Sequence, residues 1–313
     1  MEKERKRISV LVPTYNEAEN VVALCEALVL EFERSLSAYD YEILFIDNAS
    51  EDSTRQKLIE LCAENPHVRA IFNARNFGQF NSPYYGICQT TGDCTISMCA
   101  DFQDPVEMLP RLVEKWEEGY LVVCAVKTAS RENKLMRFFR SCYYKLIKKM
   151  SCVPQIEHFT GFGLYDKSFV EVMRRLEDPT PFLRGVVAEF APCRIEIPYT
   201  QARRRAGRTH NDVASLYDAA WQSFTAYTKL PIRFIAVLGW VLLALSMVLG
   251  TVLLLGAQWG SAGAIFVIIF CTSLVLISLG ILGEYILTLR DKVMRRPLVV
   301  EERRIGFDPP YPS

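Results

Sequence analysis

The sequence predicts an α/β domain with a mostly parallel sheet, followed by a C-terminal transmembrane hairpin of two helices. Three observations support this prediction. Apolar runs and amphipathic helical patterns alternate five times between residues 8 and 125, as in a sheet covered by helices on both faces. Residues 234–283 contain no charged side chain, which is enough apolar chain for two bilayer-spanning helices. Three oxygen-bearing side chains, Asp101, Gln103 and Asp104, crowd the end of one predicted strand.

Each predicted strand is short, apolar and followed by polar or turn-forming residues. The strands are expected at residues 8–12, 41–46, 68–72, 95–98 and 121–125. The amphipathic helices are expected at residues 16–35, 53–64, 82–89 and 106–118. Asn16 and Asp104 are predicted to cap the first and the last of these helices. Because ligands bind at the carboxyl ends of parallel strands, the loops after the strands are expected to form one site.

The composition limits the class of protein. The 313 residues include 36 basic and 36 acidic side chains, and this zero net charge argues against a general nucleic-acid-binding protein. None of the ten cysteines forms a C-x-x-C pair, so a reduced setting without a zinc site is expected. The charged N-terminus has no apolar signal region, which predicts a protein that is not secreted. No phosphate-binding motif of the dinucleotide or P-loop type is present.

The late apolar stretch predicts the domain organisation and the topology. A polar, glycine-containing break at residues 257–261 divides it into two halves. Basic residues flank the stretch on both sides and the connecting loop has none, so both ends are expected in the cytoplasm. The predicted units are a cytoplasmic domain at 1–230, the hairpin at 231–289 and a cytoplasmic tail at 290–313. A multi-pass protein of the inner, cytoplasmic membrane is the expectation.

Two helices of the first unit are expected to lie on the membrane surface. Residues near 131–150 and 212–229 place apolar side chains at helical spacing, and the first of these segments is rich in Lys and Arg. This pattern is typical of an interfacial helix on an anionic leaflet. An ordinary amphipathic helix packed on the domain is the alternative for residues 131–150.

Four motifs, in order along the chain, resemble those of the family 2 glycosyltransferases with a GT-A fold. They are residues 12–17 (VPTYNE), 46–54 (IDNASEDST), 75–78 (RNFG) and 100–105 (ADFQDP). With the two predicted spans, the chain looks like the branch that makes polyprenyl-phosphate sugars, which includes dolichyl-phosphate mannose synthase and GtrB- or ArnC-type enzymes. The resemblance implies an inverting transfer of a hexose from a UDP- or GDP-sugar to undecaprenyl or dolichyl phosphate. It also implies a divalent metal, Mg²⁺ or Mn²⁺, and a homo-oligomer.

The resemblance assigns roles to individual residues of this chain. Those expected to bind the nucleotide sugar are Pro13, Tyr15, Glu17, Asp47, Arg75 and Asp101, with Asp47 contacting the base. Those expected to act in catalysis are Asp101, Gln103 and Arg184, of which Asp101 and Gln103 are also the expected metal ligands. Those expected to bind the acceptor and the diphosphate are Arg131, Arg184, Arg204, Arg205 and Arg208.

The chain departs from the family pattern at four positions. Cys99 stands where the first Asp of an Asp-x-Asp motif is usual, and because a thiol is a poor Mg²⁺ ligand, Asp101 would bear more of the metal binding. Gly161 and Gly163 stand where many relatives have an acidic residue and an Arg, and His210 replaces a Lys. A phosphate acceptor has a second pKa of about 6, so it needs cationic positioning rather than a general base.

Two other functions remain open at this stage. A processive polysaccharide synthase would share the fold, but its Gln-x-x-Arg-Trp motif is missing from this sequence. A non-catalytic, membrane-tethered scaffold that binds a nucleotide sugar is the other alternative, and in that case Cys99 and Gly161 would mark lost catalysis.

Overall fold

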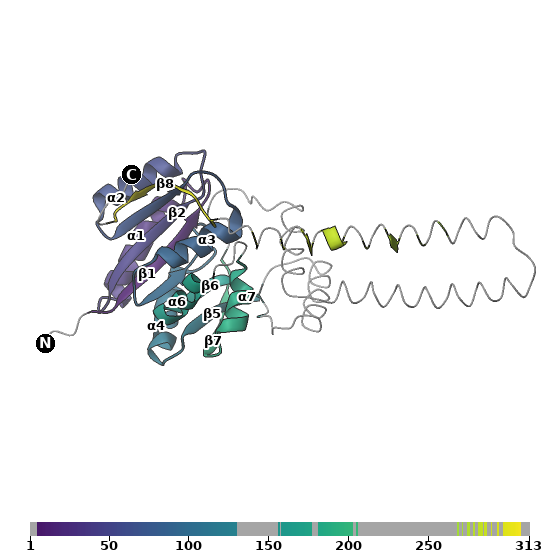
Figure 1. Cartoon of the computed structure of the whole chain (residues 1–313). Coiled ribbons are helices and arrows are strands. Elements are labelled where there is room, and N and C mark those ends of the chain that lie inside the picture. Colours follow the sequence, from purple (N-terminus) through teal and green to yellow (C-terminus); the bar gives the residue numbers. More distant parts are fainter. Residues whose placement is uncertain are drawn as a thin grey trace, which may run out of the picture.

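The computed structural model describes residues 5–129, 156, 158–176, 181–202, 205, 268, 271, 274, 275, 278, 281–283, 285, 286, 289, 293 and 297–307. These residues form a sheet with helices on both faces (Figure 1), which confirms the predicted α/β class. The predicted helices near 131–150 and 212–229 lie outside the described residues, as does most of the predicted hairpin. None of the helices in the described ranges is long and apolar enough to cross a membrane.

The sheet has eight strands in the order β7-β5-β6-β4-β1-β2-β3-β8. Their bounds are β1 Arg7–Thr14, β2 Asp40–Asp47, β3 Val68–Asn73, β4 Cys94–Ser97, β5 Val122–Ala129, β6 Phe159–Asp166, β7 Arg194–Thr200 and β8 Glu301–Ile305. The four central strands β4-β1-β2-β3 are parallel, and β7 is parallel to β5. β6 and β8 run antiparallel to their neighbours, so the sheet is mixed and mostly parallel.

The helices divide between the two faces of the sheet and bury two apolar layers. They are α1 (Val21–Ser35), α2 (Thr54–Glu64), α3 (Gly78–Gln89), the 3-10 turn η1 (Val106–Met108) with α4 (Leu109–Glu117), α6 (Lys167–Arg175) and α7 (Leu183–Phe190). The helices α1, α2 and α4 pack on one face, and α3, α6 and α7 pack on the other. The sheet therefore forms the middle of three layers.

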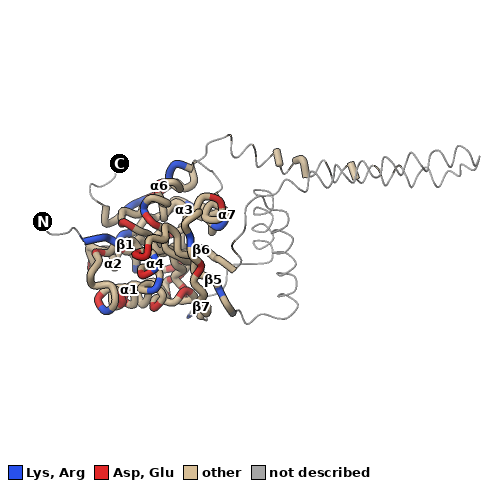
Figure 2. Tube along the Cα trace, turned by 90° about the horizontal axis from the view of Figure 1, so that it is seen from below, with Lys and Arg blue, Asp and Glu red and all other residues tan. Residues whose placement is uncertain are grey.

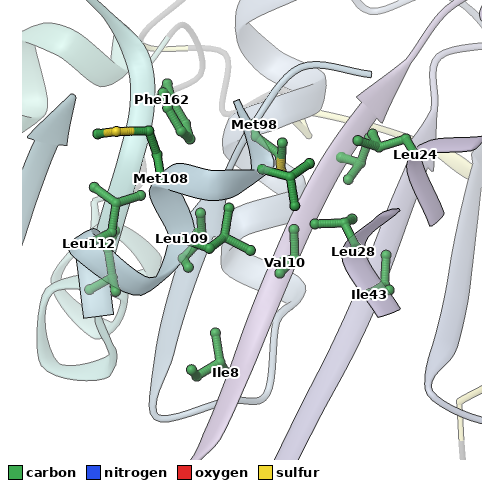
Figure 3. Packing of buried hydrophobic residues seen from close by; sticks show 14 of the residues in the cluster. Ile8, Val10, Leu24, Leu28, Ile43, Met98, Met108, Leu109, Leu112 and Phe162 are labelled. Atoms are coloured by element: carbon green, nitrogen blue, oxygen red, sulfur yellow. The ribbon is translucent and has the colours of Figure 1, made fainter. Parts of the chain in front are cut away.

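Alternation along β1 explains how one strand serves both layers. Successive side chains of a strand point to opposite faces, so Val10 joins the layer under α1 while Leu11 joins the layer under α3. Figure 3 shows Val10 beside Leu24 and Leu28 of α1. The side chains of Val10, Leu11, Leu24 and Leu28 are fully buried, and each such burial stabilises the folded state by about 1.5–3 kcal/mol.

Two helix starts differ from the sequence prediction. The first helix begins at Val21 rather than after Asn16, because Asn16 has a left-handed backbone with φ of 55°. Its side chain accepts the Glu51 N–H at 2.8 Å and its own N–H donates to Ser50 Oγ at 2.9 Å. Asn16 therefore joins two loops instead of capping a helix. The third helix begins at Gly78, four residues earlier than predicted.

The predicted cap at Asp104 was also wrong. The 3-10 turn η1 that precedes α4 starts after Pro105, and no side chain caps it. The Asp104 carboxylate instead accepts the Cys99 N–H at 3.0 Å and the Tyr199 hydroxyl at 3.0 Å. It therefore ties the acidic loop to β7, a strand that the sequence analysis did not predict.

Candidate active site

The carboxyl ends of the parallel strands meet at one edge of the sheet, which we call the carboxyl edge. Strands β1, β2, β3 and β4 end there at Thr14, Asp47, Asn73 and Ser97. Antiparallel β6 begins at the same edge, because Phe159 pairs with the end of β5. The loops that the four motifs predicted therefore lie side by side, as expected.

The Asp47 carboxylate holds together the loop that follows β2. Its side chain is fully buried, and it accepts the Ser50 N–H at 3.1 Å and the Ser50 hydroxyl at 2.5 Å. The Arg55 guanidinium lies 3.3 Å away. Burial raises the pKa of Asp47, and the bonds from Ser50 oppose that shift. Asp47 thus organises this loop, while its contact with a base stays a prediction.

The remaining residues of the first motif line the same corner. Pro13 is part of β1 and pairs with Ile46 of β2. Tyr15 and Glu17 are partly buried in the loop after β1. The Glu17 N–H donates to Thr54 Oγ1 at 2.9 Å, and its carboxylate accepts from the Asn20 side chain at 2.6 Å. The first motif is thus attached to the start of α2.

An amide network that the sequence analysis missed shapes the third loop. Asn73 Nδ2 donates to Asn48 Oδ1 at 3.1 Å and to Ser82 Oγ at 3.0 Å. Asn48 Nδ2 donates to Asn76 Oδ1 at 2.8 Å. The Phe77 N–H donates to Asn48 Oδ1 at 2.9 Å, and the Gly78 N–H donates to Asn76 Oδ1 at 2.8 Å. This network could have been predicted from the sequence, because Asn48 and Asn73 lie at the ends of two neighbouring strands.

Arg75 is the exposed cation of this loop. Its guanidinium lies over the Phe77 ring, 4.3 Å from the ring centroid. A cation over an aromatic face is attracted by the ring quadrupole. Phe77 therefore helps to hold Arg75 at the carboxyl edge, where the sequence analysis predicted it.

The acidic loop follows β4 and contains the predicted metal ligands. Asp101 is buried, and one of its carboxylate oxygens accepts the Gln103 N–H at 3.1 Å. Between them, Phe102 has a left-handed φ of 60°, which folds the loop back on itself. Gln103 Oε1 accepts from the Gln201 side chain at 2.7 Å. The structure therefore places Asp101 and Gln103 together, and both present hard oxygen donors of the kind that Mg²⁺ and Mn²⁺ prefer.

Cys99 lies beside these carboxylates. Desolvation raises the pKa of its thiol well above the ordinary value, and the charges of Asp104 and Asp101 raise it further. Part of the residue is nevertheless accessible to solvent. That Asp101 rather than Cys99 binds a metal stays a prediction. Among the described residues, no group of three His, Cys, Asp or Glu side chains is arranged to hold a metal.

Two of the arginines predicted to bind the acceptor and the diphosphate are described, and both lie near the carboxyl edge. Arg184 in α7 is half-buried, donates to the Phe159 carbonyl at 3.4 Å and lies over the Phe182 ring. Arg205 is exposed, and its guanidinium lies over the Phe102 ring of the acidic loop. The predicted residues Arg131, Arg204, Arg208 and His210 lie outside the described residues.

The backbone of β6 explains why residues 161 and 163 are glycines. Gly161 has a φ of +105°, a left-handed conformation that side chains rarely adopt. Gly163 lies so close to β5 that a Cβ atom would clash with the Val123 carbonyl oxygen. The sheet therefore requires Gly163, and the backbone conformation at Gly161 favours glycine.

An open hollow of about 850 Å³ lies at the opposite, amino edge of the sheet. Its lining mixes both signs of charge, and Figure 2 shows the same mixture over the rest of the described domain. Two of its acids have partners: Lys6 pairs with Glu117 at 2.9 Å, and Asp93 accepts the backbone N–H of Arg7 at 2.9 Å. We therefore place the functional site at the carboxyl edge, where the four motifs meet.

Sequence comparison shows the class of protein to which this three-layered α/β domain belongs. The model of the family described as "Glycosyl transferase family 2" matches residues 9–173, more than half of the chain. The chain belongs to this family, and its domain has the GT-A fold. It is a glycosyltransferase.

Relatives of similar length narrow the comparison. A prophage bactoprenol glucosyl transferase homolog of Escherichia coli (strain K12) is 30% identical over 95% of this chain and 99% of its own length. A bactoprenol glucosyl transferase of Shigella phage SfX is 31% identical over 93% of this chain and 97% of its own. An undecaprenyl-phosphate 4-deoxy-4-formamido-L-arabinose transferase of Klebsiella pneumoniae (strain 342) is 31% identical, covering 93% and 91%.

Proposed function

We propose that this chain transfers a hexose, with glucose as the first candidate, from a nucleoside diphosphate sugar to the phosphate of a polyprenyl lipid. The names of the relatives support both the sugar and the acceptor in this proposal. Two of the names say that glucose is transferred, and all three name bactoprenol or undecaprenyl phosphate. The third relative is named for a different sugar, so the three names agree on the lipid acceptor but not on the sugar.

The proposal rests on one observation: the chain leaves the sheet and rejoins it at the same edge. It leaves after β7, which ends at Thr200 on the carboxyl edge, because β7 is parallel to β5. It returns at β8, whose first residue Glu301 pairs with Asn73 at the end of β3, again on the carboxyl edge. The predicted membrane hairpin lies between these two points. Both of its connections thus start at the edge that holds Asp101.

The described positions between 268 and 289 agree with a membrane setting. They are helical, and several of their large apolar side chains are 47–64% exposed. These side chains are Ile268, Val275, Leu282, Ile286 and Leu289. Such exposure is unfavourable in water but favourable in lipid, whose hydrocarbon core takes up apolar side chains. We propose that the hairpin anchors the domain at the cytoplasmic face, with the carboxyl edge toward the lipid.

The chemistry follows from the charges at this edge. An oxygen of the acceptor phosphate attacks the anomeric carbon while the bond from that carbon to the diphosphate oxygen breaks, so the configuration is inverted. The acceptor is largely an anion at neutral pH and needs no base. Arg75, Arg184 and Arg205 supply positive charge near the growing negative charge. We propose that Asp101 and Gln103 hold a divalent cation, which would neutralise charge on the departing diphosphate.

The test is a transfer assay with the full-length protein in detergent or membranes. Undecaprenyl phosphate, UDP- and GDP-hexoses and Mg²⁺ or Mn²⁺ are supplied, and the lipid product is identified by mass spectrometry. Asp101→Ala should lower turnover about 10²-fold or more, as expected for loss of a charge-stabilising group. Asp40→Ala changes an acid at the amino end of β2 and is the matched control. A folded protein that transfers no hexose to lipid from any donor would refute the proposal.

A further inference from the structure

The strand β8 is an integral part of the sheet, although it follows the predicted membrane hairpin. It pairs antiparallel with β3 and closes the edge of the sheet beside α2 (Figure 1). The guanidinium groups of Arg69 and Arg304 both lie over the Phe307 ring, 5.3 and 5.1 Å from its centroid. Val299 is buried. These contacts fix the tail to the domain.

β8 and the residue before it also contact the loop between β3 and α3 and the helix α3 itself. The Ala74 N–H donates to the Val300 carbonyl at 2.9 Å, directly before Arg75. Tyr85 in α3 donates its hydroxyl to Glu301 at 2.8 Å. The tail therefore braces the loop between β3 and α3 from outside the sheet.

The most direct connection runs through Arg55 at the start of α2. Its terminal nitrogen lies 2.6 Å from Glu302 in β8, and its Nε lies 3.3 Å from the buried Asp47 carboxylate. The same guanidinium lies over the Phe72 ring, 5.3 Å from its centroid. A planar guanidinium bound on two sides by carboxylates and on one face by a ring has little freedom to move.

The three groups differ in exposure, and this difference indicates their roles. The Asp47 side chain is 0% exposed, Arg55 is 31% exposed and Glu302 is 56% exposed. Exposed ion pairs stabilise a fold very little, so Glu302 is not needed to keep the protein folded. Its carboxylate lies next to the Arg55 guanidinium, which also contacts the Asp47 carboxylate.

We propose that Glu302 and Arg55 are positioning residues for the sugar-nucleotide site, so that the strand after the membrane hairpin completes the donor site. This inference rests on the proposed function, because it takes the Asp47 loop as the nucleotide-binding loop. Glu302 orients Arg55, Arg55 orients Asp47 and its loop, and neither Glu302 nor Arg55 takes part in the transfer step.

The experiment compares the full-length wild type with Glu302→Gln, Glu302→Asp and Arg55→Lys, using UDP and GDP as probes in calorimetric titrations and measuring KM for donor and acceptor. Glu302→Gln should weaken nucleotide binding and raise the donor KM by about three- to fivefold, the range that a partly exposed ion pair supplies. Turnover, the acceptor KM and the melting temperature should stay unchanged. Glu302→Asp should restore most of the affinity, and Arg55→Lys should not.

The control is Glu117→Gln, which breaks the Lys6–Glu117 pair at the amino edge and should leave nucleotide affinity unaltered. Equal nucleotide affinity in Glu302→Gln and wild type would overturn the inference while leaving the proposed function standing. A wild type that binds UDP or GDP but transfers no sugar would refute the proposed function alone, since the binding comparison still decides the role of Glu302. A wild type that binds neither nucleotide would overturn both.

Discussion

The bond from Tyr199 to Asp104 is expected to hold the acidic loop in its working shape. Both side chains are buried, and the hydroxyl of Tyr199 donates to the carboxylate at 3.0 Å. Burial raises the pKa of Asp104, and the Cys99 N–H and the Tyr199 hydroxyl oppose that shift by bonding to the charged form. Tyr199→Phe removes one of these two donors and leaves the ring packed against Phe162.

A hydrogen bond to a charged group contributes about 1.5–3 kcal/mol. For a chain of this size, each kcal/mol shifts the melting temperature by about 2–4 °C, so Tyr199→Phe should lower it by roughly 3–12 °C. Turnover should fall about 10- to 100-fold, because a shift of about 1 Å in a positioned group costs as much. Thermal melting and the lipid transfer assay measure the two effects in the same preparation.

Tyr39→Phe is the matched control. The Tyr39 hydroxyl also donates to a carboxylate, at 3.1 Å, but that carboxylate belongs to Glu117, which is 40% exposed and lies at the amino edge. Water replaces the lost donor there, so the change in stability should stay within about 0.5 kcal/mol. Equal melting temperatures and turnover in Tyr199→Phe and Tyr39→Phe would refute the argument that Asp104 needs Tyr199 to hold the loop.

Three further predictions follow from the same edge of the sheet. Gly163→Ala should destabilise the protein by about 1–3 kcal/mol, since its Cβ clashes with the Val123 carbonyl; an unchanged melting temperature would contradict this. Because the pKa of Asp104 is raised in the fold, its contribution to stability is complete below its ordinary pKa of about 3.9 and is lost as pH rises through the folded pKa. The melting temperature of the wild type minus that of Asp104→Asn should therefore fall as the pH rises above that ordinary pKa, and a difference that grows would mean that the shift has the opposite sign. Cys99, with its raised pKa, should react with iodoacetamide more slowly than free cysteine at pH 7.5, as peptide mass spectrometry would show.

The central strands could be predicted because their residues satisfy local rules. Residues 43–46 form a continuous apolar run that is buried on both faces of the sheet. Such a run is typical of a central parallel strand. The motif loops were predicted for a related reason, since each follows such a run directly. Neither prediction needed knowledge of distant contacts.

The last strand could not be predicted from its own residues. Four of the five residues of β8, Glu301 to Arg304, are charged, so no alternation of apolar and polar side chains marks it as a strand. It forms by pairing with β3 and by the contact of Glu301 with Tyr85, and these partners lie more than 200 positions earlier in the chain. The roles of Asn16 and Asp104 were mistaken for the same reason, because their partners are in other loops and strands.

The location of β8 has a practical consequence for producing this enzyme without its apolar segment. A fragment that ends after β7 would lack β8, and β3 would then be an unpaired edge strand. Such an edge can pair with other chains and cause aggregation. A spliced version would need to carry the chain from β7 to β8, which lie at opposite ends of the eight-strand order. Seven strand spacings amount to about 34 Å, which roughly ten extended residues span. A polar connector of at least that length, joining the end of β7 to residue 297, is the design that the fold recommends.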